Sequence, residues 1–183
     1  MFDPTVFDNI KVVLEGIVYE LDLEEKVQIT DRKDMVDLAT MSRTYSIEFS
    51  EKHNTQIRAF CSLHTGVGDL STEILEHDMY QVGCKLEVRF MIDFVGLSMD
   101  EVSNEALIIE KILQKIWENR PQITQKFSFE IKQDLSESII QNEIKLDFKR
   151  KINENHLSDL EILVEQVLLS LSTLNNKFIN RLF

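Results

Sequence analysis

The clearest pattern in the chain is an alternation of apolar and polar residues that runs twice between residues 123 and 152. The apolar positions are Ile123, Phe127, Phe129 and Ile131 in the first run and Ile140, Ile144, Leu146, Phe148 and Ile152 in the second. Because successive side chains of a strand point to opposite faces, both runs predict strands with one apolar face. The short polar link between them, residues 133–138, predicts an antiparallel hairpin.

After this hairpin the spacing of apolar residues changes to three and four, which predicts a long amphipathic helix over residues 157–178. Its apolar stripe is Leu157, Leu160, Leu163, Val164, Val167, Leu168, Leu171, Leu174 and Phe178. Asn155 or Ser158 is placed to cap the helix at its start. Neither the hairpin nor the helix can keep its apolar surface in water, so we expect the helix to pack on the apolar face of the hairpin.

Three strands are predicted upstream by the same alternation. Residues 45–49 and 57–63 alternate on either side of a polar tip and predict a second hairpin. Residues 84–94 alternate most cleanly of all. A second long helix is expected next, opened by Asp100 or Ser103 and stopped before Pro121. Its apolar residues are Leu107, Ile108, Ile112, Leu113, Ile116 and Trp117.

The N-terminal third of the chain carries a mixed signal. Apolar residues keep helical spacing from position 6 to position 21, yet residues 17–23 also alternate as a strand would. Gly16 and the crowding of β-branched residues weigh against a long helix. The preferred interpretation is a short helical turn followed by a strand over about residues 11–23, and a long helix is the alternative.

The connecting segments predict short elements. Residues 27–30 fit a brief strand, and residues 31–42 predict a short helix with Met35, Leu38 and Ala39 facing inward. Residues 69–77 predict another short helix after a glycine turn.

Together these elements predict an α+β fold, with a largely antiparallel sheet of about five to seven strands and two long helices packed on one face. The opposite face is left to water or to a partner. A chain of 183 residues fits a single domain over residues 1–183.

The net charge of the chain disfavours some classes of binding partner. The net charge is −12, and no basic stripe runs along the chain, so nucleic acid and anionic membrane are disfavoured as partners. The positive excess over residues 111–151 is interleaved with acids and is interpreted as solvated surface. No apolar run reaches the ~20 residues that span a bilayer, and the N-terminus lacks the basic start of a signal peptide, which together predict a cytoplasmic protein.

Candidate chemistry in the sequence is sparse. Cys61 and Cys84 fall on apolar strand faces and are expected to be buried and reduced. Asp69, Glu73, Glu76 and His77 share a helix face, and carboxylates with an imidazole can bind a divalent metal. The Glu-x-x-His spacing of helical di-iron sites is absent, so a solvated acidic helix is preferred.

The remaining signals also have structural interpretations. Gly66-Val67-Gly68 before a helix resembles a phosphate loop in part, but it lacks the other residues of that motif, and a turn capped by Asp69 or Ser71 is preferred. His53, His64 and His156 lie in no recognised nucleophile context. We therefore predict no catalytic residue, no metal site and no cofactor.

Two functional interpretations follow from these patterns. The favoured one is a non-enzymatic interaction module that binds a protein partner or a second copy of itself. The alternative is a small-ligand-binding protein, or an enzyme, with a pocket between sheet and helices. A pocket with converging polar residues would favour the alternative.

One possible interaction surface can be named from the sequence. Phe60 and Met91 break the polar register of the strand faces that point away from the helices, and we expect them to be neighbours, ringed by Arg58, Arg89 and Glu87. Aromatic residues and methionine are enriched at protein interfaces. The competing interpretation is that a loop or the N-terminal segment covers them.

Overall fold

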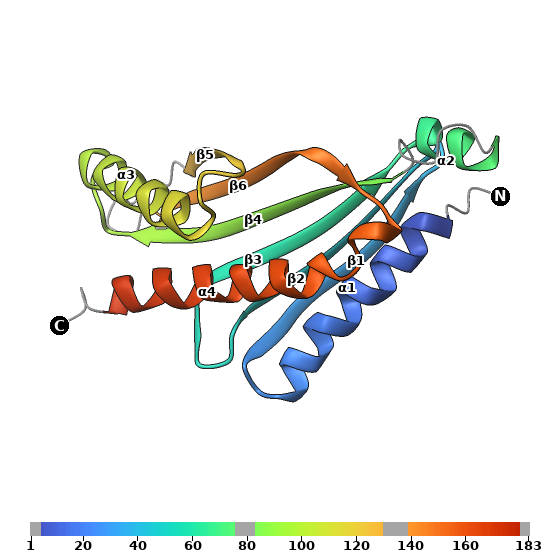
Figure 1. The fold of residues 1–183 in the computed structure, drawn as a ribbon. Helices are drawn as coiled ribbons and strands as arrows, with labels where there is room; N and C mark the ends of the chain where they lie inside the picture. The colour runs from blue at the N-terminus through green and yellow to red at the C-terminus, as the bar shows by residue number, and fades with distance from the viewer. Residues whose placement is uncertain (1–4, 76–82, 130–138, 180–183) are drawn as a thin grey trace.

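The computed structural model describes residues 5–75, 83–129 and 139–179, and a six-stranded antiparallel sheet forms the centre of this part of the chain (Figure 1). The sheet order is β1-β2-β3-β4-β6-β5. The strands are β1 (Val27–Asp37), β2 (Ser42–Glu51), β3 (Asn54–Thr65), β4 (Cys84–Val95), β5 (Gln122–Phe129) and β6 (Ile139–Ile152). The helices are α1 (Thr5–Leu23), α2 (Val67–Ile74), α3 (Met99–Ile116) and α4 (Asp159–Ile179), with the 3-10 turn η2 (Glu154–His156) before α4.

The long helices lie on one face of the sheet. Figure 1 shows α1 and α4 crossing the strands on the same side, and α3 packs against α4 and β5. The predicted fold class, α+β with a largely antiparallel sheet, is confirmed. The described residues contain a third long helix besides the two expected, because the N-terminal segment is helical. No described helix has both the length and the apolar composition needed to cross a membrane.

The predicted strand over residues 11–23 is wrong, because α1 is continuous through them. The side chains that α1 buries are Val6, Phe7, Ile10, Leu14 and Val18. Their three- and four-residue spacing puts them on one face, and burial of that face outweighs the weak helix propensity of the β-branched residues. Gly16 is exposed, and a Cβ there would meet no other atom within 4 Å, so it interrupts no packing.

The predicted helix over residues 31–42 is also wrong. β1 continues to Asp37 and pairs with β2 up to the hairpin end, where Asp37 stands opposite Ser42. Met35 and Leu38, which were expected inside, are 51% and 80% exposed. The register shifts between Ile29 and Asp31, and this bulge disrupts the alternation on which the sequence prediction depended.

Charged residues replace apolar ones where β1 faces α1. Asp34 lies 2.9 Å from both the Lys11 Nζ and the Arg43 Nε, and an Arg43 terminal nitrogen lies 3.1 Å from Asp8. We call these four residues the α1–β1 ion-pair cluster. The Arg43 guanidinium, with help from Lys11, lowers the pKa of the Asp34 carboxyl to about 2. The cluster therefore ties the helix to the edge strand with charged groups that are mostly shielded from water.

The predicted hairpins are confirmed as β2–β3 and β5–β6, with Tyr45 opposite Leu63 and Ile123 opposite Leu146. The predicted link over residues 133–138 lies outside the described residues. Cys61 and Cys84 are buried and unbridged, and burial raises the pKa of each thiol to about 12.

The helix predicted from Asp100 or Ser103 is α3, but Ser98 caps it. The Ser98 hydroxyl accepts from the Glu101 N–H, and the Glu101 carboxylate accepts from the Ser98 N–H, which forms a capping box. The expected apolar stripe is partly wrong, since Leu107 and Ile108 are 58% and 38% exposed. The buried residues of α3 are Val102, Glu105, Ala106, Ile109 and Leu113.

The apolar stripe of α4 is confirmed as a buried face. Its innermost side chains, Leu160, Val164, Val167, Leu171 and Leu174, are at most 2% exposed. The prediction that α4 packs mainly on the β5–β6 hairpin is wrong. The helix lies chiefly over β3 and β2 and against α1 and α3, and this placement leaves space beside β6.

Candidate ligand-binding cavity

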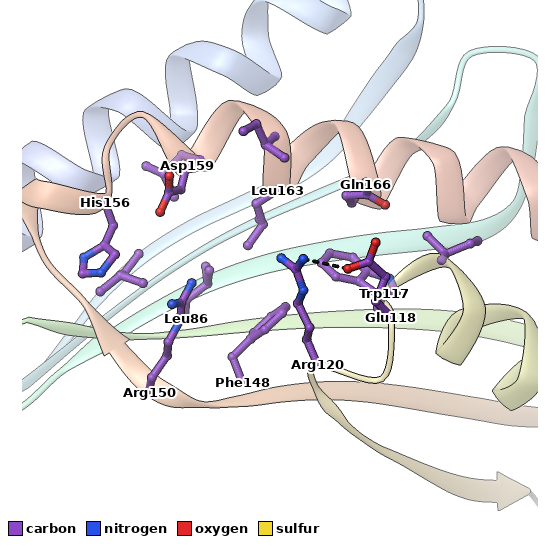
Figure 2. Close-up of a pocket in the computed structure, with 14 residues that line it drawn as sticks. Leu86, Trp117, Glu118, Arg120, Phe148, Arg150, His156, Asp159, Leu163 and Gln166 are labelled. Atoms are coloured by element: carbon purple, nitrogen blue, oxygen red, sulfur yellow. Dashed lines mark hydrogen bonds and ion pairs between the residues drawn. The ribbon is translucent and has the colours of Figure 1, made fainter.

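A cavity of about 600 Å³ opens between β6, the end of α3 and the first turns of α4 (Figure 2). Its apolar lining consists of Leu86, Ile116, Trp117, Phe148, Ile152, Leu160, Ile162 and Leu163. Its polar lining consists of Glu118, Arg120, Arg150, His156, Asp159 and Gln166. We call it the β6–α4 cavity. Its volume lies within the range of roughly 300–1,000 Å³ that is typical of small-molecule sites.

An irregularity in β6 supplies one wall of the cavity. The register with β4 passes from Lys85 opposite Lys151 to Glu87 opposite Asp147, so residues 148–150 stand against Leu86 alone. Lys149 has a φ of 56°, in the left-handed region. Such bulges re-aim side chains. Here Phe148 and Arg150, on either side of Lys149, both line the cavity (Figure 2).

The connection from α3 to β5 supplies a second wall. Trp117 is the C-cap of α3, and its Nε1 donates to the Ser170 hydroxyl of α4 at 3.0 Å. Its ring meets the ring of Phe148 edge-on, with centroids 5.5 Å apart. This geometry fixes both aromatic faces of the cavity.

Backbone strain gathers at the same place. Five of the described non-glycine residues have a positive φ. Three of the five lie in the two segments that line the cavity: Glu118, Asn119 and Lys149. A left-handed conformation costs free energy for residues with a Cβ, and such strain tends to be kept at functional sites.

The polar groups of the cavity differ in how far they are already partnered. Arg120 pairs with Glu118 at 2.7 Å, as the dashed line in Figure 2 shows. The His156 Nδ1 is 2.8 Å from the Asn153 side-chain oxygen, which leaves Nε2 to meet a ligand. The Gln166 Oε1 is buried and has no hydrogen-bond partner among the described residues. Buried polar atoms normally have partners, so this oxygen is a candidate to accept a hydrogen bond from a ligand.

The acidic residues of α2 have structural partners. Glu73 accepts the N–H groups of Thr5 and Val6 at 3.0 and 3.3 Å, and so caps the start of α1. The predicted cap, Asp69 or Ser71, is wrong, because α2 begins earlier and its N-cap is Gly66. Asp69 stands at the third position of the helix, where it accepts the Gly66 N–H at 3.3 Å, and it also pairs with Lys151. Glu76 and His77 lie outside the described residues. Within the described ranges no three His, Cys, Asp or Glu side chains are grouped as metal ligands would be.

Of the three histidines considered from the sequence, only His156 lines the cavity. His53 is exposed at the β2–β3 turn. His64 places its Nδ1 3.0 Å from the Thr44 hydroxyl on the neighbouring strand.

Phe60 and Met91 lie side by side on the sheet face opposite the helices. Phe60 stands opposite Arg89 and Met91 opposite Arg58, so the two apolar side chains are diagonal neighbours, as expected. Both are half-buried, and the Arg89 guanidinium lies 5.2 Å from the centre of the Phe60 ring. α1 lies on the other face and does not cover them.

The charged ring around these two residues is paired internally. Arg58 lies 3.4 Å from Glu48, and Arg89 lies 3.3 Å from Glu87 and 2.9 Å from Glu143. The surface named from the sequence is thus contiguous, but its arginines are already engaged.

Sequence reasoning missed the cavity residues Arg120, Arg150 and Gln166. One signal for Arg150 was present in the pattern. The apolar residues of this strand stand at even positions, and Arg150 occupies an even position between Phe148 and Ile152. A charged residue at an inward position marks either an error of register or a polar site inside the fold.

No protein-family model, curated protein or solved structure matches this chain.

Proposed function

We propose that this protein is a non-enzymatic binding protein that takes a small amphipathic molecule into the β6–α4 cavity. The observation that carries the proposal is the cavity itself, in which the rings of Trp117 and Phe148 form an apolar wall and polar side chains converge at the rim. Small-molecule sites combine these two features, because apolar contact supplies affinity and a few polar groups set orientation.

Trp117 provides a built-in reporter of occupancy. It is the only tryptophan of the chain and it lines the cavity. A neutral apolar fluorophore, N-phenyl-1-naphthylamine, should therefore bind saturably and receive excitation energy from Trp117. Absence of saturable energy transfer in the wild-type protein would contradict the proposal.

Two matched leucine variants on α4 locate the binding. Leu163 lines the cavity, whereas Leu169 is 49% exposed and lies outside the lining. We expect Leu163→Phe, which fills part of the cavity, to weaken binding of the neutral probe about tenfold, equivalent to about 1.4 kcal/mol. Leu169→Phe should leave it unchanged. Circular dichroism melts of both variants establish that they are folded, and equal binding by the two would place the probe elsewhere.

We also propose that the sheet face opposite the helices is a surface for a protein partner or a second copy of the chain. The supporting observation is the pair Phe60 and Met91, two neighbouring apolar side chains in the middle of a charged face. Side chains of this kind are enriched in the centres of protein interfaces.

A further inference from the structure

We infer that the polar end of the molecule bound in the β6–α4 cavity is a carboxylate, held by the guanidinium of Arg150. This inference rests on the proposed binding of an amphipathic molecule and adds the chemical class of that molecule. It is carried by the position of an arginine without an ion-pair partner at the rim of a cavity that has both apolar and polar lining residues.

Arg150 is the middle member of three consecutive bases, and its neighbours are engaged. Lys149 pairs with Asp147 at 3.0 Å, and Lys151 pairs with Asp69. Among the described residues, no carboxylate lies within ion-pair distance of Arg150. Arg150 is also the member of the three that lines the cavity. An arginine presents a fork of N–H donors that matches the two oxygens of a carboxylate.

Two of the other charges of the cavity are paired with each other, since Arg120 lies 2.7 Å from Glu118. Asp159 lies in the first turn of α4, where the helix dipole stabilises its carboxylate without cancelling the charge. Of the two arginines of the lining, Arg150 is the one with no described carboxylate within ion-pair distance. Because the chain carries a net charge of −12, general attraction of anions is not expected, and selective anion binding would have to be local.

The neighbours of Arg150 complete the polar end of the site. Figure 2 shows Arg150, His156 and Asp159 toward one end of the cavity and Trp117 and Gln166 toward the other. The Asn153 N–H donates to the His156 Nδ1 at 3.2 Å, which leaves the Nε2–H to donate to a carboxylate. A carboxylate at the first end would leave the apolar body of the molecule against Trp117.

The test compares two probes, 11-(dansylamino)undecanoic acid and its methyl ester, which differ by one methyl group and by the negative charge that this group removes. Both are excited by energy transfer from Trp117. We expect the wild-type protein to bind the acid about tenfold more tightly than the ester, and Arg150→Gln to bind the two equally. Lys149→Gln is the matched control, since it removes the adjacent positive charge outside the cavity, and it should keep the preference for the acid.

Each outcome decides a separate point. If the ester binds the wild-type protein as tightly as the acid, the carboxylate inference fails and the proposed function stands. If neither probe shows saturable energy transfer, both fail. If Lys149→Gln loses the preference as Arg150→Gln does, the preference reflects general charge and the assignment to Arg150 is wrong. Arg150 is exposed at the cavity rim, so the variant is expected to melt at the wild-type temperature.

Discussion

Leu171 and Leu169 are two residues apart on α4 and have opposite environments. Leu171 is fully buried under the helix, whereas Leu169 is 49% exposed on its outer side. The difference comes from helical geometry alone, since two residues turn the side chain through more than half of the helix circumference. The contribution of a leucine to stability depends on which of these positions it occupies.

We expect Leu171→Ala to lower the free energy of unfolding by about 2–5 kcal/mol, because it removes a buried side chain and leaves a cavity against the sheet. Leu169→Ala, the matched control, should change it by less than about 0.5 kcal/mol. Chemical denaturation of both variants measures the difference. A loss below about 0.5 kcal/mol for Leu171→Ala would mean that α4 does not pack inward.

At the scale of secondary-structure elements, two kinds of contact attach α1 to the sheet. On its buried side α1 packs by the apolar stripe, and at the sheet edge it is held by the α1–β1 ion-pair cluster of Asp8, Lys11, Asp34 and Arg43. The side chains of Lys11 and Arg43 are only 13% and 14% exposed. Ion pairs shielded to this extent contribute more than fully exposed ones.

This attachment predicts a pH-dependent contribution to stability. The folded pKa of Asp34, about 2, lies below its ordinary value of 3.8. Its stabilisation is therefore complete above pH 3.8 and is lost as the pH falls through about 2. Once screening by solvent is allowed for, we expect Asp34→Asn to cost about 1–2 kcal/mol at pH 6 and almost nothing below pH 2.

Urea denaturation of the wild type and Asp34→Asn across this pH range measures the effect. Glu20→Gln, which removes an exposed carboxylate from α1, is the control and should give a small difference with no such pH dependence. A wild-type advantage that stays constant down to pH 2 would show that the charge of Asp34 is not its source.

The whole molecule is asymmetric about its sheet. All the described long helices lie on one face, and the other face carries paired charges around Phe60 and Met91. Antiparallel sheets commonly leave one face to solvent, so the asymmetry alone does not require a partner. The proposed interface depends on whether these two side chains meet another molecule.

The double variant Phe60→Asp with Met91→Asp tests this. If the face is an interface, the variant should keep the wild-type melting temperature and lose association, measured by light scattering over a concentration series. Phe129→Asp with Met35→Asp is a matched control, because these residues are 60% and 51% exposed elsewhere on the molecule. Unfolding of the first variant, or a wild-type protein that is monomeric and captures no partner, would exclude an interface at this site.

The elements predicted correctly from the sequence are those whose periodicity is uninterrupted. β4 alternates without a break, and the stripe of α4 keeps helical spacing to the end of the helix, so local geometry alone gave the right element and the right buried face. The signals for the two hairpins were also local, because each hairpin joins two strands that follow each other in the sequence across a short polar segment.

Tertiary contacts decided the elements whose local signals were mixed. α1 is a helix because its stripe is buried, although residues 17–23 also alternate. β1 is a strand because it pairs along β2, although Arg32 and Asp34 replace apolar residues on its inner face. Pairing partners and burial are contributed by distant parts of the chain, so the local pattern could not distinguish the alternatives.

The cavity also depends on tertiary contacts. The sequence placed Phe148 and Ile152 correctly on an inward face, but the space beside them depends on α4 lying over β3 and β2. The access of Arg150 to that space depends on the bulge opposite Leu86, a feature of the pairing between two strands more than fifty residues apart. By itself the sequence determined which residues alternate as in a strand and which repeat with helical spacing. Only the packing of these elements created the site, because a cavity forms between the surfaces of elements that pack against one another.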